Sequence, residues 1–252
     1  MAYLHGKFVW FEHVSNDVQK SRAFYAGLFG WNSDGVPVGD QTYHMIQNGS
    51  EGIGGFRTAM PGMPNHWMSY LSVADVDGTL SSALAAGAKV LMPAGDFGPV
   101  GRGATVADPT GAVLSVWKSA QGDRPDGQTI APGDWYWNEC WTPDAAAALA
   151  FYERVFGYTH TSMDMGPQGS YYVLMKDGVA RAGLMRSPDP KAPPAWLPYV
   201  SVADCDATAK RAASLGAQTI VPPMDIPDVG RFAVLMDPVG AVIGVIRGKF
   251  TG

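Results

Sequence analysis

Residues 8–31 read FVWFEHVSNDVQKSRAFYAGLFGW, and a related stretch, WYWNECWTPDAAAALAFYERVFGY, occupies residues 135–158. In each copy, residues typical of a strand precede a helical pattern that ends at a glycine, which is Gly30 in the first copy. An offset of 127 residues aligns two pairs of chemically distinctive residues, Trp10 with Trp137 and Glu12 with Glu139. The pattern that decides the fold is therefore present twice.

A second pair of stretches is more similar still. Residues 67–118 align with residues 196–247 without a gap, at an offset of 129 residues, and share SVAD, VGR and DPxGAV segments. We therefore predict a tandem duplication of a unit of about 120 residues. The predicted domains are residues 1–121 and 133–252, joined by a polar linker at residues 122–132 that contains Pro and Gly.

Each copy mixes strand and helix patterns. In the first copy we expect helices near residues 16–29 and 76–86, and a type I turn at Asp108-Pro109-Thr110-Gly111. The expected strands are residues 8–14, 43–47, 53–57, 68–73, 104–107 and 112–118. The copy thus reads roughly as strand-helix-strand-strand, twice over, with room for an extra strand in each half. The predicted fold class is α+β.

Composition narrows the function classes. Of 252 residues, 46% are hydrophobic and 16% are charged, which is typical of a folded chain, and the net charge is −5 with no basic block. We therefore expect neither a nucleic acid nor a membrane as a partner. No apolar run reaches the ~18 residues of a membrane span, and no signal-peptide pattern is present. Two cysteines, Cys140 and Cys205, fit a reducing compartment, so we expect a cytoplasmic protein.

The chain resembles the vicinal oxygen chelate superfamily, which includes glyoxalase I, extradiol dioxygenases and bleomycin-resistance proteins. The resemblance rests on the helix that ends in Phe-Tyr and Phe-Gly-Trp, on Val-Ala-Asp-Val-Asp at residues 73–77, on Gly87-Ala88, and on the Asp-Pro-x-Gly-Ala hairpin. It covers nearly the whole chain in both copies. It implies four βαβββ modules that form two open, cup-shaped barrels, each around a cavity.

Enzymes of this superfamily usually hold a divalent metal through His and Glu on strands that face the cavity. The resemblance places the ligand positions at Trp10, Trp137, Met68, Leu197, Ser115, Gly244, Gly54-Gly55 and Ala182-Gly183. None of these is a good ligand, and an indole offers only an N–H donor. We therefore predict no metal. The alternative is a Fe, Zn, Ni or Mn site built from other residues, such as Glu12, His13, His44 and His66.

Strand alternation places Trp10, Glu12 and Val14 on one face of the first strand, and this face should line the cavity. A carboxylate between aromatic rings is desolvated, so Glu12 and Glu139 are the candidate acid/base residues. The candidate ligand-binding residues are Trp10, Trp137, Tyr43, His44, Trp67, Tyr172, Trp196, Arg102 and Arg231. The alternatives are that the aromatic residues pack in the core, and that the arginines pair with a glutamate of the cavity or with Asp96 and Asp225.

The sequence therefore favours a small-molecule-binding protein that lacks the family metal. It would be either a metal-independent enzyme with a cavity glutamate as acid/base, or a sequestering protein of the bleomycin-resistance kind. One alternative is a metal-dependent glyoxalase, lyase or dioxygenase, and another is a non-catalytic scaffold for interaction or regulation. If one cavity alone is active, we expect it to be the first. The chain already holds two units, so both a monomer and a homodimer are compatible with it.

Overall fold

The computed structural model describes residues 2–38, 41–127 and 129–249. The first half forms β1 (Phe8–Ser15), α1 (Val18–Phe29), β2 (Asn32–Val38), β3 (Gln41–Asn48), β4 (Glu51–Thr58), β5 (His66–Ser72), α2 (Val76–Ala85), β6 (Lys89–Asp96), β7 (Gly101–Ala107) and β8 (Val113–Ser119). The second half forms β9 (Trp135–Thr142), α3 (Ala145–Phe156), β10 (Thr159–Asp164), the 3₁₀ turn η1 (Gly166–Gln168), β11 (Ser170–Lys176), β12 (Val179–Arg186), β13 (Ala195–Ser201), α4 (Cys205–Ser214), β14 (Gln218–Ile226), β15 (Gly230–Met236) and β16 (Val242–Gly248).

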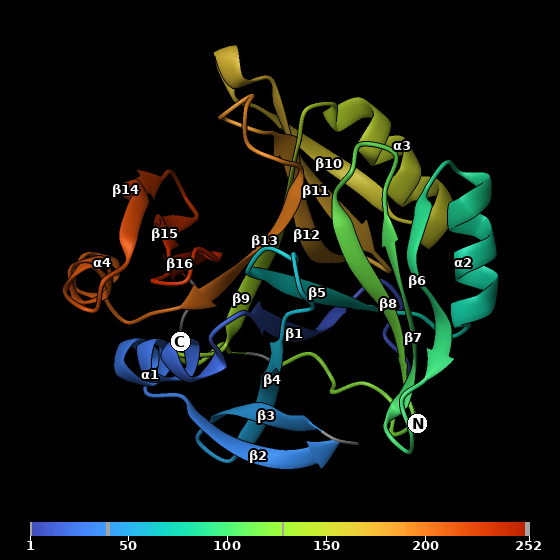
Figure 1. The fold of residues 1–252 in the computed structure, drawn as a ribbon. Coiled ribbons are helices and arrows are strands. Elements are labelled where there is room, and N and C mark those ends of the chain that lie inside the picture. Colours follow the sequence, from blue (N-terminus) through green and yellow to red (C-terminus); the bar gives the residue numbers. More distant parts are fainter. Residues whose placement is uncertain (1, 39–40, 128, 250–252) are drawn as a thin grey trace. The chain divides into compact units, whose positions relative to one another are not determined.

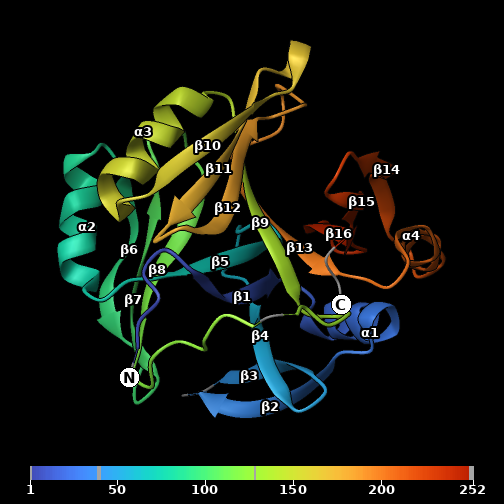
Figure 2. The same ribbon diagram turned by 180° about the vertical axis from the view of Figure 1, so that it is seen from behind.

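These elements repeat a βαβββ pattern four times, in modules that begin at β1, β5, β9 and β13 (Figures 1 and 2). They build two eight-stranded sheets with the strand orders β2-β3-β4-β1-β5-β8-β7-β6 and β10-β11-β12-β9-β13-β16-β15-β14. The first and last strands of a module run parallel, as β1 and β4 do, and the hairpins are antiparallel. The predicted α+β class and the duplication are confirmed, and the sheets are open rather than closed into barrels.

The strand that follows each helix was the least visible in the sequence. These strands, β2, β6, β10 and β14, all lie at the ends of their sheets. Most of their residues are exposed, as in β10, where all six are. An edge strand that is exposed on both faces shows no alternation of polar and apolar residues, so its pattern resembles that of a loop.

Two compact units are formed, and each combines modules from both halves of the chain. Unit 1 comprises Met1–Trp10, Met68–Asp126 and Trp137–Trp196, so it joins the second and third modules. Unit 2 comprises Phe11–Trp67, Gly127–Tyr136 and Leu197–Gly252, so it joins the first and fourth modules. The domains predicted from the repeat, residues 1–121 and 133–252, describe the two copies of the duplicated sequence. The compact units divide the chain differently.

Helix boundaries follow from local chemistry. In all four helices an aspartate precedes the first turn and accepts a hydrogen bond from a backbone N–H three residues later, as Asp17 does from Lys20 and Asp144 from Ala147. Helices α1 and α3 end at Gly30 and Gly157, whose φ angles of 74° and 65° lie in the left-handed region that favours glycine.

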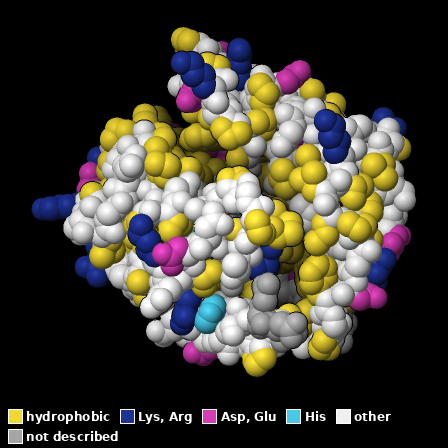
Figure 3. Space-filling view, in the orientation of Figure 1, with side chains coloured by type: hydrophobic (Ala, Val, Ile, Leu, Met, Phe, Trp, Pro, Cys, Tyr) yellow, Lys and Arg dark blue, Asp and Glu magenta, His cyan; other side chains and the backbone are white. Residues whose placement is uncertain are grey.

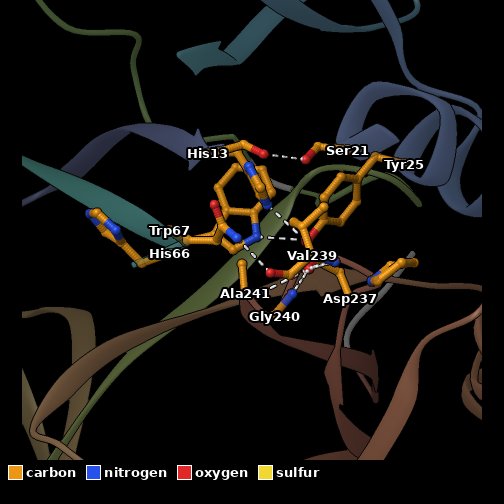
Figure 4. A network of polar contacts seen from close by, with 12 residues as sticks. His13, Ser21, Tyr25, His66, Trp67, Asp237, Val239, Gly240 and Ala241 are labelled. Atoms are coloured by element: carbon orange, nitrogen blue, oxygen red, sulfur yellow. Dashed lines mark hydrogen bonds and ion pairs between the residues drawn. The ribbon is translucent and has the colours of Figure 1, made fainter. Parts of the chain in front are cut away.

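The most deeply buried polar contacts join the hairpin of one module to the helix of the other module in the same unit. In unit 2, Asp237 Oδ1 accepts hydrogen bonds from the backbone N–H groups of its own turn, at 2.8 to 3.0 Å. Its Oδ2 accepts one from the Tyr25 hydroxyl at 2.9 Å, and the Trp67 indole N–H donates to the same hydroxyl oxygen at 2.9 Å (Figure 4).

Unit 1 repeats this arrangement. Asp108 accepts from its own turn and, at 2.9 Å, from the Tyr152 hydroxyl, which in turn accepts from the Trp196 indole at 2.9 Å. Burial and the nearby carboxylate raise the pKa of Tyr25 and Tyr152 well above 10, so both hydroxyls keep their protons. The aspartate that the sequence assigns to a turn is thus also a tertiary acceptor.

His13 adds a contact that unit 1 lacks. Its Nε2 lies 2.7 Å from Asp237 Oδ2, with both side chains fully buried, whereas the aligned residue of unit 1 is the buried Cys140 (Figure 4). Burial alone would raise the pKa of Asp237. The hydrogen bond and attraction of His13, with donors from Ala241 and Tyr25, bring it below the ordinary value instead.

The distribution of charged side chains on the surface agrees with the small net charge of −5. On the face shown in Figure 3, the Lys and Arg side chains are scattered singly or in small groups, with Asp and Glu between them. In the part of the chain that the structure describes, no helix is both long and apolar enough to span a membrane.

The role of His13 can be tested with His13→Cys, which gives unit 2 the residue of unit 1. Loss of this partner should move the pKa of Asp237 up toward its ordinary value. A carboxyl whose folded pKa lies below its unfolded value of about 3.9 adds stability above that pH, and this stability is lost as the pH falls through the folded pKa. We expect the variant to lose roughly 1–3 kcal/mol at neutral pH. Its free energy of unfolding should also depend less on pH below about 4.

The measurement is urea-induced unfolding from neutral pH down to about pH 2. The control is His66→Ala, which removes an imidazole of unit 2 that makes no hydrogen bond to Asp237 and should keep the acid dependence. An unchanged acid dependence in His13→Cys would show that His13 does not stabilise the ionised Asp237.

Candidate functional site

One face of β9 carries Trp137, Glu139 and Trp141 at alternate positions, so the three side chains point to the same side of the strand. Glu139 is 8% exposed, while the two tryptophans are half-buried. The Trp141 indole N–H donates to Glu139 Oε1 at 2.5 Å. The buried carboxylate thus lies between two partly accessible aromatic rings.

Tyr171, on β11, completes this group. Its hydroxyl accepts a hydrogen bond from the Trp137 indole N–H at 2.8 Å and donates one to Glu139. Burial, and next the charge of Glu139, raise the pKa of Tyr171 well above 10, so the phenol stays protonated and keeps donating. Trp137, Glu139, Trp141 and Tyr171 are called the Glu139 cluster below.

A glycine makes room for the tyrosine. Gly183 on β12 is the register partner of Glu139 on β9. A Cβ added to Gly183 would overlap the Tyr171 hydroxyl and lie 2.8 Å from the Trp137 Nε1. In unit 2, Gly55 has the same relation to Glu12 and to the hydroxyl of Tyr43. In both units the space that a side chain would take on this strand is therefore filled by a phenol.

Glu12, the counterpart of Glu139, has a different partner. It is 5% exposed, and Arg57 Nε donates to its Oε2 at 2.7 Å. Arg57 pairs in register with Val14, and the corresponding pair in unit 1 is Met185 with Trp141. An ion pair in unit 2 thus replaces the indole–carboxylate hydrogen bond of unit 1.

Further polar groups lie near Glu12. His66 donates from Nδ1 to the Pro64 carbonyl oxygen at 2.8 Å. Its pKa is lowered, first by burial and also by Arg57 and His13, although the charge of Glu12 acts in the opposite direction. Glu12 therefore has a cationic partner, Arg57, and a polar imidazole nearby.

The two predicted arginines have carboxylate partners on their own modules. Arg102 pairs with Asp77 at 2.8 Å and Asp96 at 2.9 Å. Arg231 pairs with Asp206 at 2.6 Å and Asp225 at 3.2 Å. The ion pairs with Asp96 and Asp225, which the sequence offered as an alternative, are present. Their carboxylates are largely exposed, so each pair contributes little to stability.

The other predicted residues have varied surroundings. Trp67 and Trp196 are buried and donate to Tyr25 and Tyr152, as described above. Trp10 is half-buried on β1. The pKa of His44 is lowered by burial and by Arg22.

Tyr172 contacts His160 edge-on and lines a hollow of about 370 Å³ together with Arg186 and the start of α3. A second hollow, of about 530 Å³, lies along α1 and β2, and neither hollow includes Glu12 or Glu139.

The sequence interpretation missed Tyr171 by one residue. Neighbours on a strand point to opposite faces, so Tyr171 contacts Glu139 while Tyr172 faces the other side of the sheet. The repeat contained the signal, because an offset of 128 residues aligns Tyr43 with Tyr171. The sequence interpretation also missed Arg57, whose contact with Glu12 depends on the parallel pairing of β1 with β4.

Comparison with known proteins gives the family. A family model described as the Glyoxalase/Bleomycin resistance protein/Dioxygenase superfamily matches residues 7–116 and 138–245. The Mycobacterium tuberculosis protein named "Putative glyoxylase CFP32" is 40% identical over 97% of this chain and 96% of its own length. The anthracycline biosynthesis protein DnrV of Streptomyces peucetius is 33% identical over 94% and 92%.

Solved structures agree on the fold. The Mn(II)-bound glyoxalase from Novosphingobium aromaticivorans matches with a TM-score of 0.66 at 19% identity, over 98% of this chain and 82% of that one. The 2,3-dioxygenase LapB from Pseudomonas sp. KL28 matches with a TM-score of 0.64 at 13% identity, over 98% and 93%. With two family matches that together span most of the residues, this chain belongs to the Glyoxalase/Bleomycin resistance protein/Dioxygenase superfamily.

Proposed function

We propose that this protein binds a planar aromatic small molecule at the Glu139 cluster, and that Glu139 accepts a hydrogen bond or a proton from a hydroxyl group of that molecule. The observation that carries the proposal is the position of the carboxylate. Glu139 is 8% exposed and lies between the Trp141 N–H and the Tyr171 O–H, on a strand face with two half-buried indoles.

The chemistry of the cluster suits such a ligand. An ionised carboxylate only accepts hydrogen bonds, and the N–H of Trp141 and the O–H of Tyr171 hold Glu139 in one orientation. The indole and phenol rings supply flat, polarisable surfaces against which a planar ring system can stack. A hydroxyl group at the edge of that ring system would then reach the carboxylate, which can act on it as a general base or hold it as an acceptor.

The relatives support this ligand class. Two Streptomyces proteins that align over 94% of the chain are named for anthracycline biosynthesis. Anthracyclines are planar, hydroxylated polycyclic molecules, which is the shape and donor pattern that the cluster would accept. We propose the chemical class and not a particular member of it.

The proposed function uses no metal. The residues at the family's ligand positions do not fit a divalent ion, because Trp137 offers only an N–H, which it donates to Tyr171. At Gly183 and Gly244 a ligating side chain would overlap Tyr171 and Tyr199. Within residues 2–38, 41–127 and 129–249, no three His, Cys, Asp or Glu side chains are grouped to hold a metal ion.

Each residue of the cluster has a distinct part in the proposal. Tyr171 stays protonated and orients the carboxylate, because burial and Glu139 raise its pKa. Trp137 fixes the phenol through its 2.8 Å hydrogen bond. Trp141 holds the carboxylate through its hydrogen bond to Oε1. Glu139 is thereby preorganised to receive a donor without moving.

A hydroxylated anthraquinone, 2,6-dihydroxyanthraquinone, serves as the probe for the ligand class, because its hydroxyls lie at the ring edge, away from its own carbonyl groups. We expect it to quench tryptophan fluorescence in a saturable titration. Glu139→Gln should weaken binding about tenfold or more, because a buried hydrogen bond to a charged group is worth roughly 1.5–3 kcal/mol. The control is Glu12→Gln, which changes the equivalent carboxylate of unit 2. Equal affinity of Glu139→Gln and the unchanged protein would refute the proposed site.

Metal independence is tested separately. We expect native mass spectrometry of protein purified without chelators or metal-affinity resin to give the mass of the chain without stoichiometric Fe, Zn, Ni or Mn. Probe affinity should also be the same before and after dialysis against a chelator. A stoichiometric metal whose removal abolishes binding would contradict the proposal and favour ligands among Glu12, His13, His44 and His66.

A further inference from the structure

We infer that only unit 1 takes the ligand, and that two pairs of aligned positions, 57 with 185 and 14 with 141, decide this selectivity. The inference rests on the proposed function and deepens it, since it assigns one ligand molecule to each chain. It also differs from the sequence expectation, which favoured the first copy.

In unit 2, Arg57 already occupies the carboxylate that a ligand would need. Its Nε donates to Glu12 Oε2 at 2.7 Å, and the Glu12 side chain is only 7% exposed. The Arg57 side chain is 35% exposed, so the ion pair joins a buried carboxylate to a partly accessible guanidinium. A ligand hydroxyl would have to displace a charge-assisted hydrogen bond, and a neutral donor cannot replace the lost ion pair.

In unit 1 the aligned residue is Met185, a buried side chain without a charge. Glu139 instead accepts from Trp141, which takes the position of Val14. This donor is neutral and is also an aromatic surface, so it orients the carboxylate and offers a ring for stacking at the same time.

The wider surroundings of the two carboxylates differ in the same direction. Two polar side chains that lie near Glu12 are replaced in unit 1 by apolar residues: Arg57 by Met185 and His66 by Ala195. A less polar environment strengthens a hydrogen bond between Glu139 and a ligand hydroxyl and favours an aromatic ring system. The duplicated site is thus retained in unit 1 and closed by an internal ion pair in unit 2.

The test is carbon-detected NMR of the intact protein labelled with ¹³C at the glutamate side-chain carboxyl carbons. The signals of the two residues are assigned with Glu12→Gln and Glu139→Gln. On titration with 2,6-dihydroxyanthraquinone, we expect the Glu139 signal to shift and to saturate at one equivalent, while the Glu12 signal stays in place.

Two other outcomes separate the inference from the proposed function. A shift of the Glu12 signal together with that of Glu139, saturating at two equivalents, overturns the inference and leaves the proposed function standing. No shift of either signal overturns the proposed function.

A transplant tests the named positions. Trp141→Val/Met185→Arg gives unit 1 the residues of unit 2, and we expect it to weaken probe binding at least tenfold. The matched control is Met185→Leu, which keeps an apolar side chain and should bind as the unchanged protein does. Full binding by a folded double variant would overturn the role of these positions. If the double variant does not fold, the carboxyl titration of the unchanged protein still decides which unit binds.

Discussion

Each compact unit depends on a buried carboxylate that joins the hairpin of one module to the helix of another. Asp237 and Tyr25 are 212 positions apart, and Asp108 and Tyr152 are 44 apart, yet both pairs make the same 2.9 Å hydrogen bond. The same carboxylates accept backbone N–H groups of their own turns. One side chain therefore fixes the turn geometry and the contact between modules, and removing it would leave several buried donors without partners.

Both units contain this contact, whereas other aligned positions differ between them. Unit 2 adds His13 to the aspartate, and Arg57 to Glu12, so its buried carboxylates have more polar partners. Unit 1 has Cys140 and Met185 at the aligned positions, and it surrounds Glu139 with neutral donors from Trp141 and Tyr171. Two units with one backbone plan thus present a carboxylate in two different chemical environments, and fold alone does not determine the function of either.

The candidate site is built from aromatic rings around a carboxylate. The strand positions where the resemblance places metal ligands carry Trp, Met, Leu, Ser, Ala or Gly rather than His or Glu. Phenol groups occupy the space beside those glycines, and in unit 1 the phenol is hydrogen-bonded to the glutamate. A partly accessible group of aromatic rings around a carboxylate supports the proposal that unit 1 binds an organic ring system.

The sequence by itself determined the duplication, because the two copies align over most of their length. It also determined the helices, the glycine that ends α1 and the shared face of Trp137 and Glu139, because these depend on spacing within a short stretch. The βαβββ order was implied by the family resemblance, since the strand after each helix has no clear pattern of its own. The sequence could not determine which modules combine into a unit, since the contacts that join them link distant turns and helices. It placed Tyr172 rather than Tyr171 beside the site, because a shift of one residue reverses the face of a strand. Only the tertiary structure decided that Arg57 forms an ion pair with Glu12, while Tyr171 and Trp141 donate hydrogen bonds to Glu139. These contacts depend on strand register and on side chains up to 45 residues apart, which local patterns do not encode.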